Sequence, residues 1–435
     1  MKLPSGSNRR VAAKQRNLAS KTQVKTISPA RMAAFEILTL VGENRGNSDD
    51  LLHGHRTAAL SPEDRNLVTT LVLGVLRWQI ALDARIQPLL QRPGQRLAET
   101  VAIALRLGAF QLQQLDRIPA HAAINESVEL TRASGNPHAA GMVNAILRKL
   151  ASAPPQGKRL HESTAVFAQR LGHPQWLVER WVASYGRQVA LKICEADQIE
   201  PGEPKLFAEI ADVTLPQIDD GSRLVAELTA ASAPDAKRVW DACAAPGGKT
   251  LVLAQRFPRA EILVTDVSSR RLDRMLSRLD EYPYAASVRA ETADATELPA
   301  SFGSFDLILC DVPCSGTGTL SRNPEIRHRL ASADLARHAA RQRGILNAAL
   351  GRLAPGGRLV YSTCSLESEE CEKVVESVVA ESAARVIPME PVLDGLLSRG
   401  AILEGLDGAT RNNFLRTLPG THPGDGFFAA LFERA

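Results

Sequence analysis

The feature that most constrains this chain is a repeated order of apolar run, small-residue turn and helical segment that begins near Lys237. Five short runs are apolar enough to form buried strands: 238–241, 261–266, 305–310, 357–362 and 426–432. Strands that alternate with helices predict a parallel, doubly wound α/β sheet, here within residues 233–435. The glycines of 422–426 predict a hairpin before the last run, which would close the edge of the sheet.

The region before this alternation has a helical pattern. Ser28-Pro29 and Ser61-Pro62 each place a capping serine before a proline, which is typical of a helix start. Proline and glycine at 92–94 and 134–137 predict breaks between helices. We therefore expect an all-α domain over residues 27–150, followed by a linker and connector over 151–232 that opens with Pro154-Pro155.

The first 26 residues hold seven basic side chains and no acidic one. This composition, with little apolar periodicity, predicts a disordered basic arm over residues 1–26. Attraction to phosphate groups and a merely solubilising tail remain equally open for it.

Composition narrows the class of protein. The chain has 435 residues, 44% of them hydrophobic and 23% charged, which predicts a soluble globular protein of two or three domains. Aromatic residues are only 4%, so a surface built on base-stacking rings is disfavoured. No apolar run reaches 18 residues and the N-terminus resembles no secretory signal, so we expect no membrane partner. The six cysteines form no CxxC pair, which predicts free thiols in a reducing cytoplasm and no metal site.

Acidic residues at three predicted strand ends indicate a nucleoside site. Asp241 precedes a small-residue turn, Asp266 follows the next run at the position that often reaches ribose hydroxyls, and Asp294 could accept from an adenine amino group. Each acid alone could be structural. The turn is no phosphate loop, because Cys243 stands where that motif needs glycine. The candidate cofactor residues are Cys243, Ala244, Ala245, Pro246, Gly247, Gly248, Lys249, Asp266, Asp294 and Asp311.

Two cysteines, Cys314 and Cys364, follow predicted strands directly, so both thiols would lie at the edge where α/β sheets carry chemistry. Either one alone could be a buried small hydrophobic residue. A pair of thiols beside an adenosine site instead favours attack by a thiolate on an electrophile.

The motifs around these cysteines resemble a known family. Asp-Val-Pro-Cys-Ser-Gly at 311–316, Ala-Pro-Gly-Gly-Lys at 245–249 and Thr-Cys-Ser at 363–365 are similar to those of RNA cytosine-5 methyltransferases that use S-adenosyl-L-methionine. Runs in the helical region resemble the NusB-type RNA-binding fold that is fused to the bacterial 16S ribosomal RNA members: 73–78, 105–112, 118–129 and 143–149. The resemblance implies an all-α NusB-like domain followed by a Rossmann-like methyltransferase domain.

The resemblance also implies roles. Cys364 would be the nucleophile that adds to carbon 6 of cytosine, Asp311 would contact the ring nitrogen N3, and Cys314 would assist release of the RNA. The implied product is a cytosine methylated at carbon 5 in small-subunit ribosomal RNA, at position 967 by the family's pattern. Two departures stand out: Cys371 occupies a position where the family usually has asparagine, and the connector lacks the expected Arg-x-Asn signature and is shortened.

Basic residues in both regions are candidate RNA contacts, although each could be an ordinary charge on a helix surface. They are Arg77, Arg148, Lys149, Arg322 and Arg327. The expected partner is small-subunit ribosomal RNA, bound by a monomer. A transfer RNA methyltransferase and a non-catalytic RNA-binding factor are the alternatives.

Overall fold

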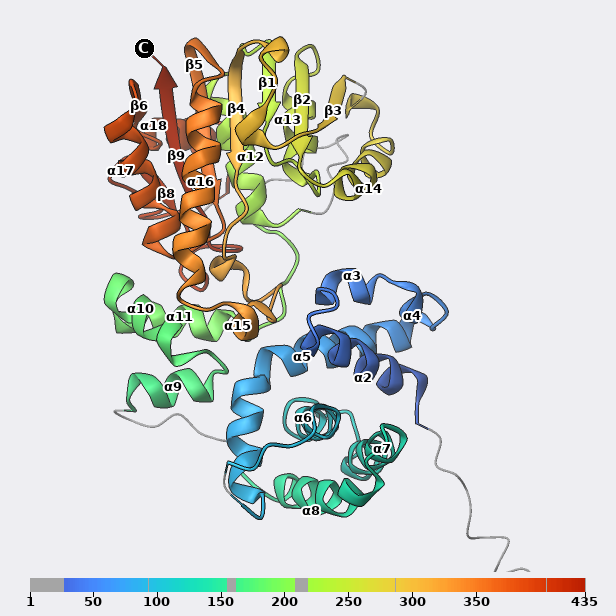
Figure 1. Ribbon diagram of the computed structural model, residues 1–435. Helices are drawn as coiled ribbons and strands as arrows, with labels where there is room; N and C mark the ends of the chain where they lie inside the picture. The colour runs from blue at the N-terminus through green and yellow to red at the C-terminus, as the bar shows by residue number, and fades with distance from the viewer. Residues whose placement is uncertain are drawn as a thin grey trace, which may run out of the picture. The chain divides into compact units, whose positions relative to one another are not determined.

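A computed structural model describes residues 27–92, 94–154, 162–207, 218–285, 287–403 and 405–434. The expected basic arm, residues 1–26, lies outside these ranges, as do parts of the expected linker and connector, 155–161 and 208–217. The chain divides into two compact units, residues 1–157 and 158–435, whose helices and strands are drawn in Figure 1. Each unit has its own apolar core.

The first unit is all-α, and its main helices are α2 (Pro29–Gly42), α5 (Pro62–Ile86), α6 (Glu99–Gln114), α7 (Ala120–Ala133) and α8 (Ala140–Ala151). The predicted helix starts are confirmed, and the Ser61 hydroxyl accepts from the Asp64 amide at 3.1 Å. Helices α5 and α6 meet closely, because a Cβ added to Gly74 would lie 2.0 Å from the Phe110 ring. Short helices α3 (Ser48–Leu52) and α4 (His55–Ala58) connect α2 to α5.

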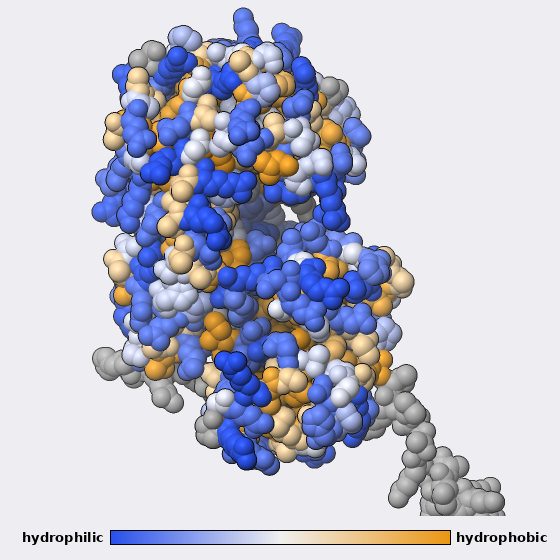
Figure 2. Space-filling view, viewed as in Figure 1, coloured by the Kyte–Doolittle hydropathy of each residue, from blue (hydrophilic) through white to orange (hydrophobic). Residues whose placement is uncertain are grey.

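One segment of this unit, Pro62–Leu89, is long and apolar enough to cross a membrane by length and composition alone. Half of its apolar window is buried within the structure, and core helices of soluble proteins meet the same criterion. On the face shown in Figure 2, hydrophilic side chains cover most of the surface and apolar ones are scattered among them.

The second unit contains the sheet, whose strand order is β3-β2-β1-β4-β5-β9-β8-β7, with β6 also paired to β9. Strands β1 (Arg238–Asp241), β2 (Glu261–Asp266), β3 (Val288–Thr292), β4 (Phe305–Asp311) and β5 (Leu353–Thr363) run parallel. The doubly wound sheet predicted from the sequence is thus confirmed. Asp311 of β4 lies opposite Ser362 of β5, so the loops after these two strands leave the same edge.

The end of the sheet differs from the prediction. Strand β9 (Phe428–Arg434) is antiparallel and forms the expected hairpin with β8 (Phe414–Arg416), but it does not close the edge. It lies between β5 and the strands beyond, because β6 (Ala384–Ile387), β7 (Thr410–Arg411) and β8 add to its far side. These three strands have two to four residues each, too short to give a periodic signal in the sequence.

Helices cover both faces of this sheet (Figure 1). One apolar core packs β-strand side chains against α12 (Asp220–Ser232), α13 (Gly248–Arg256), α14 (Ser269–Leu279) and α18 (Glu390–Ser398). The other packs the opposite face against α16 (Asp334–Leu350) and α17 (Glu372–Glu381). Cys310 is fully buried in the second core, as predicted from its position in β4.

The connector helices belong to the same unit. Helices α9 (Thr164–Arg170), α10 (Gln175–Tyr185) and α11 (Arg187–Ala196) share an apolar core with Leu320 and Leu366, which lie in loops of the sheet-containing part. Trp181 of α10 donates to Glu367 at 3.0 Å, and Arg180 forms an ion pair with the same carboxylate at 2.6 Å. The connector therefore packs directly on the segment that follows Cys364.

Candidate active site

The two thiols lie together. The Sγ atoms of Cys314 and Cys364 are 3.2 Å apart, and both cysteines are free. Cys314 follows β4 and Cys364 follows β5, and the two strands are parallel neighbours, which brings their ends to one edge. The Cys364 carbonyl accepts from the Gly318 amide at 2.9 Å, which joins the two loops through their backbones.

The surroundings keep Cys314 protonated. Its hydrogen bond with Cys364 and its burial raise the pKa of Cys314 well above the ordinary value, and the nearby charge of Glu370 acts in the same direction. A protonated Cys314 can donate its S–H to the Cys364 sulfur. The pair is thus suited to one reacting sulfur and one proton donor.

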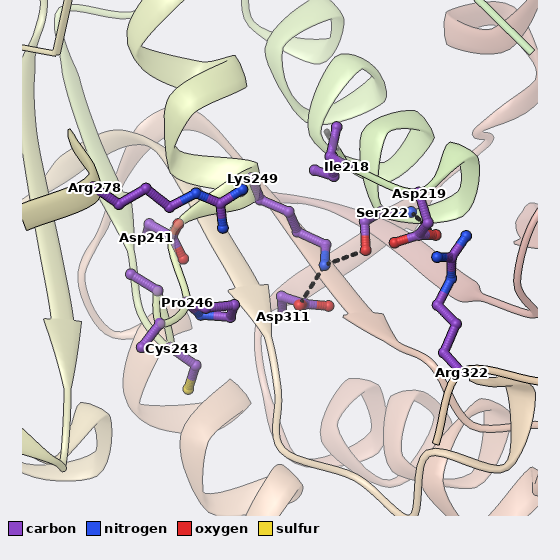
Figure 3. A pocket seen from close by; sticks show the side chains of 13 residues that line it. Ile218, Asp219, Ser222, Asp241, Cys243, Pro246, Lys249, Arg278, Asp311 and Arg322 are labelled. Atoms are coloured by element: carbon purple, nitrogen blue, oxygen red, sulfur yellow. Dashed lines mark hydrogen bonds and ion pairs between the residues drawn. The ribbon is translucent and has the colours of Figure 1, made fainter. Parts of the chain in front are cut away.

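A partly buried ion pair lies beside the thiols. Lys249 Nζ lies 2.7 Å from Asp311 Oδ2 and 3.2 Å from the Ser222 hydroxyl (Figure 3). Asp311 also accepts from Ser362 at 2.7 Å. Burial lowers the pKa of Lys249, but the charges of Asp311, Asp219 and Cys364 outweigh it and leave that pKa raised, so the ammonium stays charged.

The sequence places Lys249 in the cofactor turn and does not predict this ion pair. The motif Ala-Pro-Gly-Gly-Lys gives no sign that the side chain reaches across to the end of β4. The sequence gives one indication of the ion pair: Lys249 lies at the start of a helix that is next to the strand that carries Asp311.

The small-residue turn joins β1 to α13. Gly247 adopts a φ of +98°, and a Cβ there would lie 2.7 Å from Met275, so glycine is required on both grounds. The Ala244 amide donates to the Thr265 carbonyl at 2.9 Å, which fixes the turn to the end of β2. The turn lines two neighbouring cavities that share Cys243, Ala245 and Asp311.

The first cavity, of about 260 Å³, joins the acids to the thiols. Asp266 and Asp294 line it together with Cys314 and Cys364. Asp266 forms a 2.9 Å ion pair with Arg271, and Asp294 accepts from the amide and hydroxyl of Thr296, hydrogen bonds that lower its pKa. The second cavity, of about 200 Å³, is lined by the Lys249–Asp311 pair, Asp241 and Arg322.

Asp241, one of the three strand-end acids that predict a nucleoside site, is a further functional candidate. The Thr250 hydroxyl donates to its Oδ2 at 2.7 Å, while its buried Oδ1 has no hydrogen-bond partner among the described residues. Burial raises the pKa of this carboxyl to about 7. Asp241 lines the second cavity, where an ionised carboxylate would suit a cationic ligand group.

The remaining cysteines are poor nucleophiles. Burial raises the pKa values of Cys243, Cys310 and Cys194. Burial also raises the pKa of Cys371 to about 12, and this thiol contacts the carbonyl of Ser365. Among the described residues, no group of three or more His, Cys, Asp or Glu side chains is arranged to hold a metal.

The candidate RNA contacts differ in exposure. Arg148 and Lys149 are exposed in the last turn of α8, whereas Arg77 is a buried residue of α5 with 2% exposure, which leaves it little surface to offer a phosphate. Arg327 is 3% exposed and donates to the Asp197 carbonyl at 2.8 Å, so it links the connector to the sheet-containing part. Arg322 is held by Asp425 at 3.0 Å and lines the cavity of Lys249.

Both units of the chain match known protein families. Residues 229–433 match the 16S rRNA methyltransferase RsmB/F family, and residues 28–152 match the NusB family. "Ribosomal RNA small subunit methyltransferase B" from Xanthomonas campestris is 33% identical, over 93% of this chain and 97% of the relative. "Probable ribosomal RNA small subunit methyltransferase B" from Bacillus subtilis is 30% identical, over 93% and 98%.

Solved structures share the fold. The crystal structure of PH0851 has a TM-score of 0.72 at 20% identity and covers 94% of this chain and 99% of its own. A methyltransferase homologue from Pyrococcus horikoshii has a TM-score of 0.50 at 24% identity, over 63% of this chain and all of its own.

Proposed function

The chain belongs to the 16S rRNA methyltransferase RsmB/F family and is an S-adenosyl-L-methionine-dependent RNA (cytosine-5-)-methyltransferase, and on this premise we propose that its substrate is a cytosine of small-subunit ribosomal RNA. Position 967 is the target that the family's pattern implies. The observation that carries the chemical proposal is the 3.2 Å approach of the Cys314 and Cys364 sulfurs beside the Lys249–Asp311 pair.

The residues around the turn fit the methyl donor. Asp266 and Asp294 supply carboxylates for ribose hydroxyls and an adenine amino group, and Asp241, which lines the neighbouring cavity, suits the ammonium of the methionine part. When bound, S-adenosyl-L-methionine supplies an electrophilic methyl group. The cavity that Asp266 and Asp294 line is also lined by both thiols, so the methyl donor and the reacting sulfur would share one cavity.

We assign the nucleophile to Cys364. Its sulfur adds to carbon 6 of cytosine, and the electron pair of the C5–C6 double bond then takes the methyl group at carbon 5. As negative charge builds on the ring, N3 takes a proton that Asp311 can deliver in its acid form, and the Lys249 ammonium, 2.7 Å from Asp311, can replenish that proton and stabilise the charge. Loss of the carbon-5 proton to a base restores the double bond and expels the Cys364 sulfur, to which the Cys314 thiol can give its proton.

The helical unit supplies the other part of the proposal. Its match to the NusB family and the exposed Arg148 and Lys149 at the end of α8 support a role in binding RNA phosphates. Arg322 is the candidate phosphate contact in the methyltransferase unit, because it lines the cavity of Lys249. We propose that the protein acts as a cytoplasmic monomer.

Transfer of labelled methyl groups tests the substrate. The full chain is incubated with methyl-labelled S-adenosyl-L-methionine and either unmodified small-subunit RNA or transfer RNA, and labelled nucleosides are identified after digestion. We expect 5-methylcytosine in the ribosomal RNA only. Label in transfer RNA alone would replace the proposed substrate, and absence of transfer to either RNA would overturn the catalytic proposal.

A further inference from the structure

A buried carboxylate lies behind the two thiols and contacts both of their loops. Glu370 is fully buried in the segment after Cys364. Its carboxylate accepts four hydrogen bonds: from the Ser315 amide at 2.8 Å, from the Ser315 hydroxyl, from the Ser365 hydroxyl at 2.6 Å and from Gln342 at 3.0 Å.

These donors come mainly from the two catalytic loops. Ser315 follows Cys314 and Ser365 follows Cys364, and their hydroxyls lie 3.1 Å apart with Glu370 accepting from both. Gln342 of α16 also donates to the Pro313 carbonyl at 3.0 Å, on the other side of Cys314. The carboxylate therefore fixes the residues that flank Cys314 to the residue next to Cys364.

The backbone of Glu370 is held as well. The Tyr361 hydroxyl, which is buried, donates to the Glu370 carbonyl at 2.7 Å. Tyr361 belongs to β5, so the position of the carboxylate is set by the strand that leads to Cys364. This arrangement gives Glu370 little freedom to move without either loop.

We propose that Glu370 is a positioning residue that sets the separation of the two thiols and so couples release of the methylated RNA to formation of the covalent adduct. The inference rests on the proposed function, since it assumes that Cys364 forms the adduct and Cys314 assists its release. Glu370 touches neither substrate nor methyl donor in this role. It acts through Ser315 and Ser365 on the two sulfurs.

The test compares Glu370→Ala with Glu370→Gln. A glutamine can accept from the Ser315 amide and Gln342 through its oxygen and donate to the two hydroxyls through its nitrogen, so it preserves the connection. An alanine removes it. We expect Glu370→Ala to lower kcat about 100-fold, as for a displaced catalytic group, and to raise the fraction of protein trapped as RNA adduct on denaturing gels. KM for S-adenosyl-L-methionine should stay within about twofold, and Glu370→Gln should recover most of kcat.

Glu376→Gln is the matched control, because this glutamate is exposed on the following helix, α17. Two results would overturn the inference. In the first, Glu370→Ala slows formation and release of the adduct equally. In the second, Glu370→Gln is as impaired as Glu370→Ala. If Glu370→Ala fails to fold, Ser365→Ala takes its place and should accumulate the RNA adduct. An unchanged adduct fraction in Ser365→Ala would also overturn the inference. Wild-type protein that transfers no methyl group would instead refute the proposed function.

Discussion

At the scale of single residues, two chemically identical side chains are given different tasks by their surroundings. Cys314 is kept as a thiol by its hydrogen bond to Cys364, by burial and by the Glu370 charge. Cys364 lies close enough to Lys249 to help raise the pKa of that lysine. The negative charge of Glu370 near Cys314 helps to keep that thiol as the proton donor, which leaves the other sulfur as the proposed nucleophile.

Removal of each thiol should stop the reaction at a different step. Cys364→Ala removes the nucleophile and should abolish both methylation and adduct, whereas Cys314→Ala should let an RNA adduct accumulate. Denaturing gels with labelled RNA measure both, and Cys194→Ala, a change in α11, serves as control. An adduct with the first variant or none with the second contradicts these assignments.

Asp241 should make binding of the methyl donor depend on pH. Its pKa is raised to about 7, so the carboxyl is neutral below that pH and gains the charge that attracts an ammonium above it. Affinity for S-adenosyl-L-methionine should therefore increase about tenfold from about pH 6 to about pH 8 in calorimetric titrations. Asp241→Asn should bind more weakly at the higher pH and lose the dependence. A wild-type affinity that falls with rising pH would exclude this role.

The same raised pKa has a consequence for stability. A carboxyl whose folded pKa lies above its unfolded value of 3.8 stabilises the fold most below the unfolded pKa, and this contribution is lost as pH rises through about 7. Urea denaturation of the wild type and of Asp241→Asn isolates the contribution of this carboxyl to the free energy of unfolding. The wild type should lose stability relative to the variant over this range when no methyl donor is present.

At the scale of elements, α10 is the connector helix that bears most directly on catalysis. Arg180 and Trp181 contact Glu367, and the Tyr185 hydroxyl donates to the Leu366 carbonyl. All three contacts fall on the segment between Cys364 and Glu370. The connector is thus joined to the loop that carries Cys364.

Arg180→Met should weaken this connection. It leaves the 2%-exposed Glu367 carboxylate with only the Trp181 donor, so we expect the free energy of unfolding to fall by about 2 kcal/mol. Urea denaturation measures the loss, and kcat should fall while KM for the methyl donor changes little. Lys192→Met, on the neighbouring helix α11, is the control for removal of an exposed positive charge. An unchanged stability would show that the ion pair contributes nothing.

Elements that bury apolar residues on both faces were predictable from the sequence. The runs that form β1, β2, β4 and β5 are continuous and apolar, and the helix starts carry serine and proline. Short strands such as β7, with two residues, carry no such signal. The Lys249–Asp311 pair and the Glu370 hydrogen bonds could not be predicted either, because they depend on side chains that meet only after the sheet has formed.

At the scale of the whole molecule, affinity for RNA should depend on charges outside the methyltransferase unit. Arg148→Ala combined with Lys149→Ala should weaken binding and reduce the slope of log affinity against log salt by about 0.7 for each phosphate that is no longer neutralised. Fluorescence anisotropy of the full chain at several salt concentrations measures the slope. Glu129→Gln, on α7, is a control that removes a charge of the opposite sign. An unchanged slope would exclude α8 from the RNA-binding surface.

The position of β9 has a consequence for the order in which the enzyme is made. β9 is the last described strand in the chain, yet it pairs with β5 on one side and with β6 and β8 on the other. During translation β6 and β8 cannot join the sheet before β9 is made, since they reach it only through that strand. A nascent chain that still lacks β9 cannot complete the support of the Cys364 loop. We therefore expect the loop that carries Cys364 to reach its final position only after β9 has been made and has paired with β5.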